Sequence, residues 1–592
     1  MRIMVAQEHC DYDLIIVGAG TAGCVIANRL SEDPNLSILV LEAGEDHSSN
    51  EQIYAPGLAG SALGDSHFDW QYASQPECQL NNRVINHPRG RLLGGTSAIN
   101  SFALIYPSAA EIDAWAQVSN ENWDWQTLAP YFRKFQSIVT PSQSVKKALN
   151  LAHRDEAIQA CKGPIQASFP IRIKPLQEEW DKTFRNLGLH NADDPLDGHA
   201  LGGHTSTCHI TGDKHERSHA GTAYLEPALA RNNLTLITNV SVSRLIVERH
   251  SATPTVRGVA YSQDNVSYEA RARKEVVLAA GTFNTPKILE LSGIGDPGIL
   301  KKYEIDVYAV VPSVGRGLQD HIRPGISFEL TNDIPSFGSM PVEEARKLYE
   351  SDRSGPWAEA GAFSFSYTPL LPFLDSHEKQ ELKALLDEHL NIDELSSESE
   401  RKRYEFIRRT IESPIEATAV NFLSRKPVGG APEGNYMTLN AMLSHPLSTG
   451  SSHISSSDPK AKPEIRFEYY SHPIDLEVHA RQVQVLKKIA QTEPLASCIK
   501  SSGRQLPPVD NLESAKELCR SFSTTNYHPC GTCALGEVVD GRLKVKGVQN
   551  LRAVDASVIP IIPRGNIITT VYAVAERAAD IISDDLNLSR QT

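Results

Sequence analysis

The chain has no run of apolar residues that approaches the roughly 18 needed for a membrane-spanning helix. Its first residues, MRIMVAQEHCDYD, lack the apolar stretch of a signal peptide, so we expect a cytoplasmic protein without a membrane span. Acidic residues outnumber basic ones by 72 to 58, which gives a formal net charge of −14. Because no basic stripe offsets that charge, we expect no nucleic acid among its partners.

Cysteine and histidine are not arranged for a metal site or a disulfide framework. No His/Cys cluster has the spacing of a zinc site, so we predict no metal. Nine cysteines, an odd number in 592 residues, favour a reducing compartment. Cys530 and Cys533 form a CxxC pair, but no thioredoxin-like βαβ unit surrounds them, which argues against a redox role.

What the chain does have is an ordinary globular composition and a glycine-rich turn near its start. Apolar residues make up 40% and charged residues 22%, enough for a large core in more than one domain.

In YDLIIVGAGTAGCVIANRL, a predicted strand at 14–17 is followed by Gly18, Gly20 and Gly23 and then by a helical pattern. The first glycine permits a tight turn, the second lets the backbone approach a pyrophosphate, and the third lets helix and strand pack closely.

A second predicted strand, SILVL, is followed by Glu42, about 20 residues beyond the glycine turn. An acidic side chain at this place can bind ribose hydroxyls and repels a 2′-phosphate. The phosphates would meet the free N–H groups at the start of the helix. Strand, turn, helix and acid together predict a dinucleotide site, but they do not distinguish NAD from FAD.

Four later segments bear on that choice. They are GRLLGGTSAIN at 90–100, GTFNTPKILELSGIG at 281–295, NYHPCGTCALG from 526 and NLRAVDASVIPIIPRGN from 550. With the glycine turn, and in this order, they resemble the glucose–methanol–choline (GMC) family of FAD oxidoreductases. The resemblance spans nearly the whole chain.

The resemblance implies an α/β fold (α+β overall) with two discontinuous domains. One is a Rossmann-like FAD-binding domain, and the other is a substrate domain built on an antiparallel sheet. Alternating apolar and polar residues in 435–456 are typical of half-buried strands of such a sheet. The expected FAD-binding parts are residues 1–104, 215–325 and 535–592, and the expected substrate parts are 105–214 and 326–534.

The resemblance also implies which residues contact FAD. Ile99 stands where some family members carry the histidine that tethers the flavin, so we expect non-covalent FAD. Asp69-Trp70 resembles a family pair beside the cofactor, with plain core packing as the alternative for Trp70. The strand pattern places Val242 on a face that could touch adenine. The expected contacts are Gly18, Gly20, Thr21, Ala22, Gly23, Glu42, Ala43, Trp70, Arg91, Gly95, Thr96, Asn100, Ala103, Val242, Ala280, Gly281, Asp555, Ala556 and Ile567.

His528 is the candidate catalytic base. Oxidising an alcohol needs a base for the hydroxyl proton, and an imidazole with a pKa near 6.5 suits that task. It also needs a hydride acceptor, which flavin supplies because side chains cannot. The alternative for His528 is a purely structural histidine. Its neighbour Tyr527 is the candidate substrate contact.

Asn566 opens a helical pattern after Pro563-Arg564-Gly565, where an asparagine can simply be an N-cap. The family has histidine or asparagine here, paired with the first histidine. The resemblance therefore implies that Asn566, which cannot act as a base, hydrogen-bonds the substrate oxygen. The helix could also aim its positive end at the flavin and stabilise the reduced ring.

We therefore predict FAD-dependent oxidation of a small-molecule alcohol, by a dehydrogenase or an oxidase, with oxygen or a quinone-like compound as electron acceptor. A non-redox lyase or cyclase on the same scaffold, with His528 as acid and base, is an alternative. A second alternative is a catalytically silent flavin-binding protein, which the intact pair of His528 and Asn566 disfavours.

One segment, 376–412, is unlike a core element because it is highly charged, with sparse leucines at helical spacing. A solvated helical pair is the simplest interpretation. A lid over the entrance and a partner-binding face are the alternatives.

Overall fold

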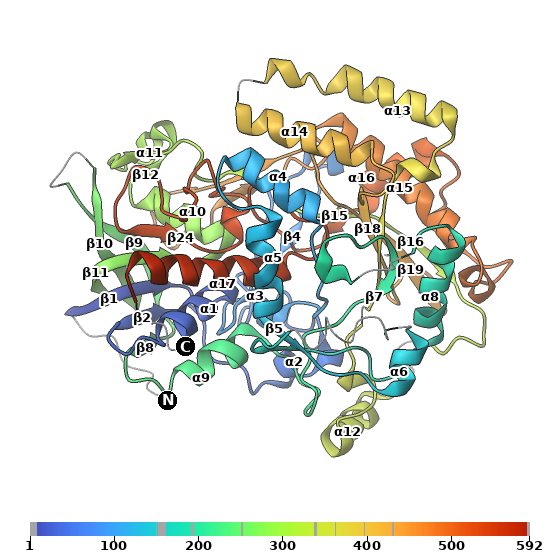
Figure 1. Cartoon of the computed structure of the whole chain (residues 1–592), viewed down its shortest axis with the longest axis horizontal. Helices are drawn as coiled ribbons and strands as arrows, with labels where there is room; N and C mark the ends of the chain where they lie inside the picture. The colour runs from blue at the N-terminus through green and yellow to red at the C-terminus, as the bar shows by residue number, and fades with distance from the viewer. Residues whose placement is uncertain are drawn as a thin grey trace.

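The structure, a computed structural model, describes residues 9–149, 151, 161–190, 194–249, 253–336, 340–361, 363–395, 397–428 and 431–588. Within those ranges, no helix is long and apolar enough to cross a lipid bilayer. Two large sheets, one mainly parallel and one antiparallel, organise the chain (Figure 1).

The first sheet has seven strands around a parallel core drawn from distant parts of the chain. In spatial order the parallel strands are β8 (Leu234–Ile237), β2 (Ile38–Leu41), β1 (His9–Val17) and β11 (Val266–Leu278), with β24 (Leu551–Ala553) also against β11. Two antiparallel strands, β10 (Thr255–Gln263) and β9 (Ser241–Glu248), complete the sheet. The apolar runs of β1 and β2 are fully buried, as expected for a parallel sheet covered on both faces.

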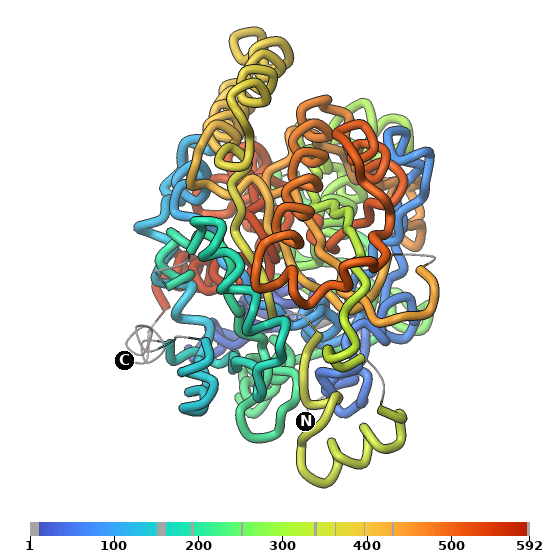
Figure 2. The backbone as a smooth tube through the Cα atoms, turned by 90° about the vertical axis from the view of Figure 1, so that its right-hand side faces the viewer, coloured from blue at the N-terminus to red at the C-terminus, as the bar shows by residue number. Residues whose placement is uncertain are grey.

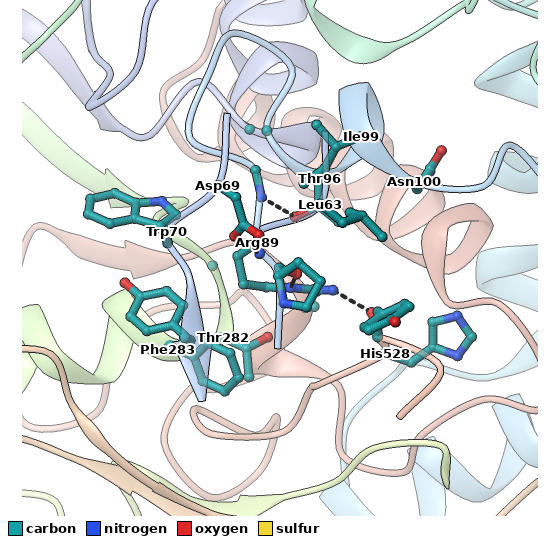
Figure 3. Close-up of a pocket in the computed structure, with 18 of the residues that line it drawn as sticks. Leu63, Asp69, Trp70, Arg89, Thr96, Ile99, Asn100, Thr282, Phe283 and His528 are labelled. Atoms are coloured by element: carbon teal, nitrogen blue, oxygen red, sulfur yellow. Dashed lines mark hydrogen bonds between the residues drawn. The ribbon is translucent and has the colours of Figure 1, made fainter. Parts of the chain in front are cut away.

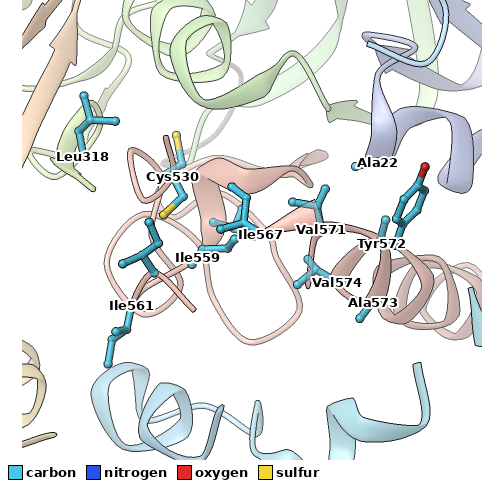
Figure 4. Close-up of a cluster of buried hydrophobic side chains, with 14 of the residues drawn as sticks. Ala22, Leu318, Cys530, Ile559, Ile561, Ile567, Val571, Tyr572, Ala573 and Val574 are labelled. Carbon is cyan, nitrogen blue, oxygen red and sulfur yellow. The ribbon is translucent and has the colours of Figure 1, made fainter. Parts of the chain in front are cut away.

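Two helices pack against each other beside this sheet, α1 (Thr21–Leu30) and α17 (Ile568–Asp585). Every residue of α1 except Arg29 is buried. Figure 4 shows Val571 and Tyr572 of α17 among the apolar side chains that surround its first turns, with Ala22 of α1 nearby. The C-terminal helix therefore fixes the helix that follows the glycine turn.

The second sheet has six strands and is antiparallel throughout. In spatial order they are β22 (Gln505–Leu506), β16 (Gly325–Glu329), β19 (Tyr436–Leu443), β18 (Ala419–Ser424), β17 (Ser364–Thr368) and β7 (Gly202–Thr205). The helix α15 (Pro473–Ala490) packs on β19, β18 and β16. The expectation of half-buried strands is wrong for β19, since all its residues are buried.

The two sheets confirm the predicted fold class. Strands of the first come from within 1–104, 215–325 and 535–592, whereas strands of the second come from 105–214 and from residue 325 onward. The exact domain boundaries stay a prediction.

The charged segment 376–412 forms two helices, α13 (Ser376–His389) and α14 (Glu398–Ile411). Only Leu382 and Leu386 of α13 are buried, and α14 packs on α4 (Ala109–Ser119). Figure 2 shows the pair, in yellow, rising beyond the rest of the molecule. This arrangement agrees with a solvated helical pair.

Candidate active site

A cavity of about 1030 Å³ lies between the two sheets. It is walled on one side by residues at the ends of β1 and β2, and on the other by residues of β18 and β19. Small-molecule sites span about 300–1,000 Å³, so this one has room for a large ligand. No residue of α13 or α14 lines it, which argues against the lid interpretation of that segment.

The glycine turn lies at the carboxyl end of β1 and leaves no room for a side chain at Gly18 or Gly23. Gly18 has a φ of +100°, and a Cβ there would lie 2.5 Å from the Ala279 carbonyl oxygen. A Cβ on Gly23 would lie 1.9 Å from the Gly18 oxygen, so this glycine packs helix against strand and does not line the cavity. A Cβ on Gly95 would lie 2.7 Å from the Cα of Gly20, which brings the second glycine-rich segment against the first.

Two carboxylates hold the loops where the cavity meets the glycine turn. Glu42 accepts hydrogen bonds from the backbone N–H groups of Ala19 (2.7 Å) and Gly44 (2.9 Å), and burial raises its pKa. Asp555 accepts from the Gly281 N–H (2.9 Å) and from the N–H of Ser557 (2.7 Å). The side chains of Glu42 and Asp555 therefore fix the loops as well as facing the cavity.

The cavity brings together nearly all the residues that the sequence proposed for the cofactor. Besides Glu42 and Asp555, its lining includes Gly18, Gly20, Thr21, Ala22, Ala43, Trp70, Arg91, Gly95, Thr96, Asn100, Ala103, Val242, Ala280, Gly281, Ala556 and Ile567. Gly23 is the exception. Trp70 is half-buried and lies under the Arg91 guanidinium, 5.3 Å from the ring centre, so it both packs and faces the cavity.

Figure 3 shows Trp70 and Phe283 on one side of this space and Asn100 and His528 on the other. Ile99, the last residue of the short helix α3 (Thr96–Ile99), is buried on the cavity wall. Asn100 follows it, and its Oδ1 accepts a hydrogen bond of 2.8 Å from the Nη1 of Arg217. The sequence interpretation did not include Arg217.

His528 lies on the cavity wall and is held on both its backbone and its ring. Its backbone N–H donates to Asp320 Oδ1 (2.7 Å), while Asp320 Oδ2 accepts from the hydroxyls of Tyr469 (2.5 Å) and Thr525 (2.6 Å). Its ring Nδ1 lies 2.9 Å from Nδ1 of His321, and the Nε2 of His321 lies 2.9 Å from the Ser444 carbonyl oxygen.

This chain of contacts determines which nitrogen of His528 carries the proton. A carbonyl oxygen only accepts, so the Nε2 of His321 donates to Ser444. Burial lowers the pKa of His321 to about 3, so the ring is neutral and its Nδ1 has a lone pair. The Nδ1–H of His528 must therefore donate to the Nδ1 of His321. The Nε2 of His528 is left with the lone pair, and the Nδ2 of Asn526 lies 3.5 Å from it.

His528 is also neutral at physiological pH. Its pKa lies well below 6.5 because the ring is buried and because His321, Arg89 and Arg323 lie nearby. The Nη2 of Arg89 donates to the Tyr527 carbonyl oxygen (2.6 Å), directly before His528 in the chain (Figure 3). Tyr527 adopts a φ of +66° and lines the cavity beside His528.

The expected helix start at Asn566 is wrong. The helix α17 begins at Ile568 with Ile567 at the N-cap and no side-chain cap, because Gly565, at φ +78°, turns the chain before the helical geometry is reached. The Oδ1 of Asn566 is buried without a hydrogen-bond partner among the described residues. Asn566 and the first turn of α17 line the cavity, and that turn has no acidic residue.

Four of these residues escaped the sequence interpretation: Asp320, His321, Arg89 and Arg217. Asp320 and His321 lie within the segment GRGLQDHI, where an adjacent aspartate and histidine were the available signal. Arg89 immediately precedes the second glycine-rich segment.

The CxxC pair does not reach the cavity. Cys530 and Cys533 are fully buried, and Figure 4 shows Cys530 among the apolar side chains of Leu318, Ile559 and Ile561. Burial raises the pKa of both thiols well above the usual value, so neither is a reactive thiolate.

Comparisons with known proteins give a consistent result. Two family models described as GMC oxidoreductase match residues 12–323 and 446–575. Dehydrogenase mpl7 of Monascus purpureus is 32% identical over 618 aligned residues, which cover 98% of this chain and 97% of that protein.

Solved structures are similar over the same length. An FAD-dependent oxidoreductase from Chaetomium thermophilum has a TM-score of 0.87 at 27% identity, covering 98% of this chain and 100% of the other. A fungal aryl-alcohol oxidase has a TM-score of 0.84 at 26% identity, with 98% and 99% covered.

Proposed function

This chain belongs to the GMC oxidoreductase family, and we propose that it holds FAD without a covalent bond and oxidises an alcohol to a carbonyl compound. FAD, when bound, supplies the hydride acceptor that no side chain can provide. Within this proposal His528 is the base, Asn566 donates a hydrogen bond to the substrate oxygen, and Tyr527 contacts the substrate.

The residues around the cavity fit this cofactor. The first turn of α1 faces the cavity with no side-chain cap, so its N–H groups and the positive end of the helix suit a pyrophosphate. Gly18 and Gly20 keep that approach free of side chains. Ile99 offers no nucleophile where a tethering histidine stands in some relatives, and this supports the absence of a covalent bond.

The observation that carries the proposal is how His528 is held: its ring Nδ1 lies 2.9 Å from the Nδ1 of His321, and its backbone N–H donates to Asp320. Its Nδ1–H donates to His321, and its Nε2 keeps a lone pair for the hydroxyl proton of the substrate. Because the ring is neutral and held through Asp320 and His321, it needs no rearrangement before accepting that proton.

Asn566 and α17 would act on the oxygen that loses the proton. The amide can donate a hydrogen bond, and the N-terminus of a helix of 18 residues favours negative charge at its end. An oxyanion that develops there is stabilised as the proton leaves.

The substrate class within the proposal is a small alcohol, and the electron acceptor is oxygen or a quinone-like compound. The relatives include a protein named a dehydrogenase and one named an aryl-alcohol oxidase, and these names leave both acceptors open within the proposal.

The test is anaerobic mixing of the purified yellow protein with a panel of alcohols, followed by flavin absorbance in stopped flow. Bleaching supports oxidation, whereas turnover without bleaching would support a non-redox lyase or cyclase. We expect His528→Ala to slow bleaching by about 10² to 10⁴, the usual worth of a general base, with FAD content retained. His377→Ala, at an exposed histidine of α13, is the matched control. Near-wild-type bleaching by His528→Ala would refute the assignment of the base.

A further inference from the structure

The antiparallel side of the cavity carries an arginine without an acidic partner. Arg323 follows His321 by two residues and lines the cavity that also contains His528. Its Nη1 donates to the Oδ1 of Asn440 (2.8 Å). Its Nε is buried without a partner, and no carboxylate of the described residues lies within 4.0 Å of its guanidinium.

The surroundings hold this guanidinium in place. The Nδ2 of Asn440 points toward the Phe422 oxygen (3.4 Å) and the Ser424 hydroxyl (3.3 Å), so its Oδ1 is left to accept from Arg323. The Phe422 ring lies 5.4 Å from the Arg323 Cζ. A side chain fixed in this way is suited to a ligand of defined geometry.

The charges around the cavity are unbalanced. The only acidic residues in its described lining are Glu42, Asp69 and Asp555, and backbone N–H groups bond all three. On the antiparallel side the lining contains Arg323, Arg425 and Lys426 with no acid. A cationic wall therefore faces this part of the cavity, in a protein whose net charge is −14.

Arg323 differs from its neighbour Arg425. The Nε of Arg425 donates to the Tyr436 carbonyl oxygen (3.0 Å), and its Nη2 donates to the Pro335 carbonyl oxygen (2.9 Å), so it clamps the backbone. Arg323 has no comparable backbone contact among the described residues and keeps donors for a ligand.

We propose that Arg323 binds a carboxylate on the substrate, so that the alcohol oxidised here is a hydroxy acid with an apolar body. This rests on the proposed function and names its substrate class. A planar guanidinium matches a carboxylate with two parallel hydrogen bonds, and a buried arginine without an acid needs such a partner. The apolar body would lie against Phe365 and Phe422, whose ring centres are 5.7 Å apart on the same wall.

The experiment compares pairs of alcohols that differ only in charge. Meta- and para-hydroxymethylbenzoate and a series of ω-hydroxyalkanoates are each paired with their methyl esters, and anaerobic flavin bleaching gives a rate constant for each. We expect the wild-type chain to prefer the best-fitting acid over its ester by at least about 30-fold, the lower range for a buried hydrogen-bonded charge pair.

Three variants locate the preference. Arg323→Gln should reduce the acid-to-ester ratio to near one, while Arg323→Lys should keep part of it, since the charge stays and the bidentate geometry is lost. Lys426→Met removes the same charge from an exposed residue of the same wall and should change the ratio by less than about 3-fold. An equal fall of the acid-to-ester ratio in Arg323→Gln and Lys426→Met would show that the positive charge of the whole wall causes the preference. That result would overturn the assignment of Arg323 as the carboxylate-binding residue.

A second readout does not depend on turnover. Sodium benzoate should perturb the flavin spectrum of the wild-type holoenzyme in a saturable way, and the Arg323→Gln holoenzyme should not respond. If alcohols bleach the flavin but esters react as well as acids, the proposed function stands and the carboxylate site is refuted. If benzoate binds through Arg323 but no alcohol bleaches the flavin, the anion site is supported and the proposed oxidation fails.

Discussion

Replacing His321 should reveal how much the protonation state of His528 contributes to catalysis. His321→Leu removes the Nδ1 acceptor 2.9 Å from the ring of His528 and the donor to the Ser444 oxygen. His321→Gln keeps both functions, because its amide can accept from His528 and donate to Ser444. The two variants therefore differ in hydrogen bonding and are similar in bulk.

The size of the effect follows from leaving a buried donor unpaired. A buried donor without an acceptor loses about 1–3 kcal/mol of free energy. In His321→Leu no acceptor remains to hold the proton of His528 on Nδ1. At about 1.36 kcal/mol per factor of ten, flavin reduction should slow by about 5- to 160-fold. In His321→Gln we expect a loss within about 5-fold.

The assay is single-turnover bleaching of the flavin by a saturating alcohol between pH 7 and 9. Burial raises the pKa of Asp320 to about 6, so this range keeps that carboxylate ionised. The wild-type rate should be flat there, because the pKa of His528 lies well below 6.5 and the rate falls only as pH drops through it. FAD content and circular dichroism check that both variants fold. Equal rates in the Leu and Gln variants would refute the tautomer argument.

Three further predictions follow from other contacts. FAD should pass through a filter after acid denaturation, since Ile99 offers no attachment point; colour retained with the precipitated chain would disprove this. Asn566→Asp should slow flavin reduction by about 10²-fold because it replaces a donor with a negative charge beside a developing oxyanion, whereas Asn566→His should cost less than about 10-fold. Equal activity of these two variants would remove Asn566 from the site. Gly23→Ala places a Cβ 1.9 Å from the Gly18 oxygen and should abolish FAD binding. Gly298→Ala, at an exposed glycine outside the cavity lining whose Cβ would meet only the Asp296 side chain, should retain it. Both are read as the ratio of flavin to protein absorbance.

The fold was predictable because its evidence is local. An apolar strand, a glycine-rich turn and a helix that begins with small residues are adjacent in the sequence. Gly18 and Gly23 have steric reasons that any chain of this fold would share. The residues proposed for FAD binding all line one cavity except Gly23.

The missed residues depend on contacts between distant segments. His321 and His528 are 207 positions apart. The Ser444 carbonyl, which accepts the proton on the Nε2 of His321, follows the last residue of β19 in the antiparallel sheet. No spacing rule predicts such a pair. The polar residues Thr438 and Asn440 misled for a related reason: their alternation in β19 marks a cavity wall, whereas the pattern alone indicated solvent.

The positive charge of Arg323 and the neutrality of His528 are linked. Burial and His321 are the two largest causes of the low pKa of His528, and the positive charges of Arg89 and Arg323 are the next two. These two cations therefore help to keep the base unprotonated before substrate binds. The same cations oppose the imidazolium that forms once the proton has moved. A carboxylate on Arg323 would offset one of them and raise the pKa of His528 when the substrate arrives. The group that selects an anionic substrate would thereby also adjust the base that acts on it, and a neutral ester would lose both effects.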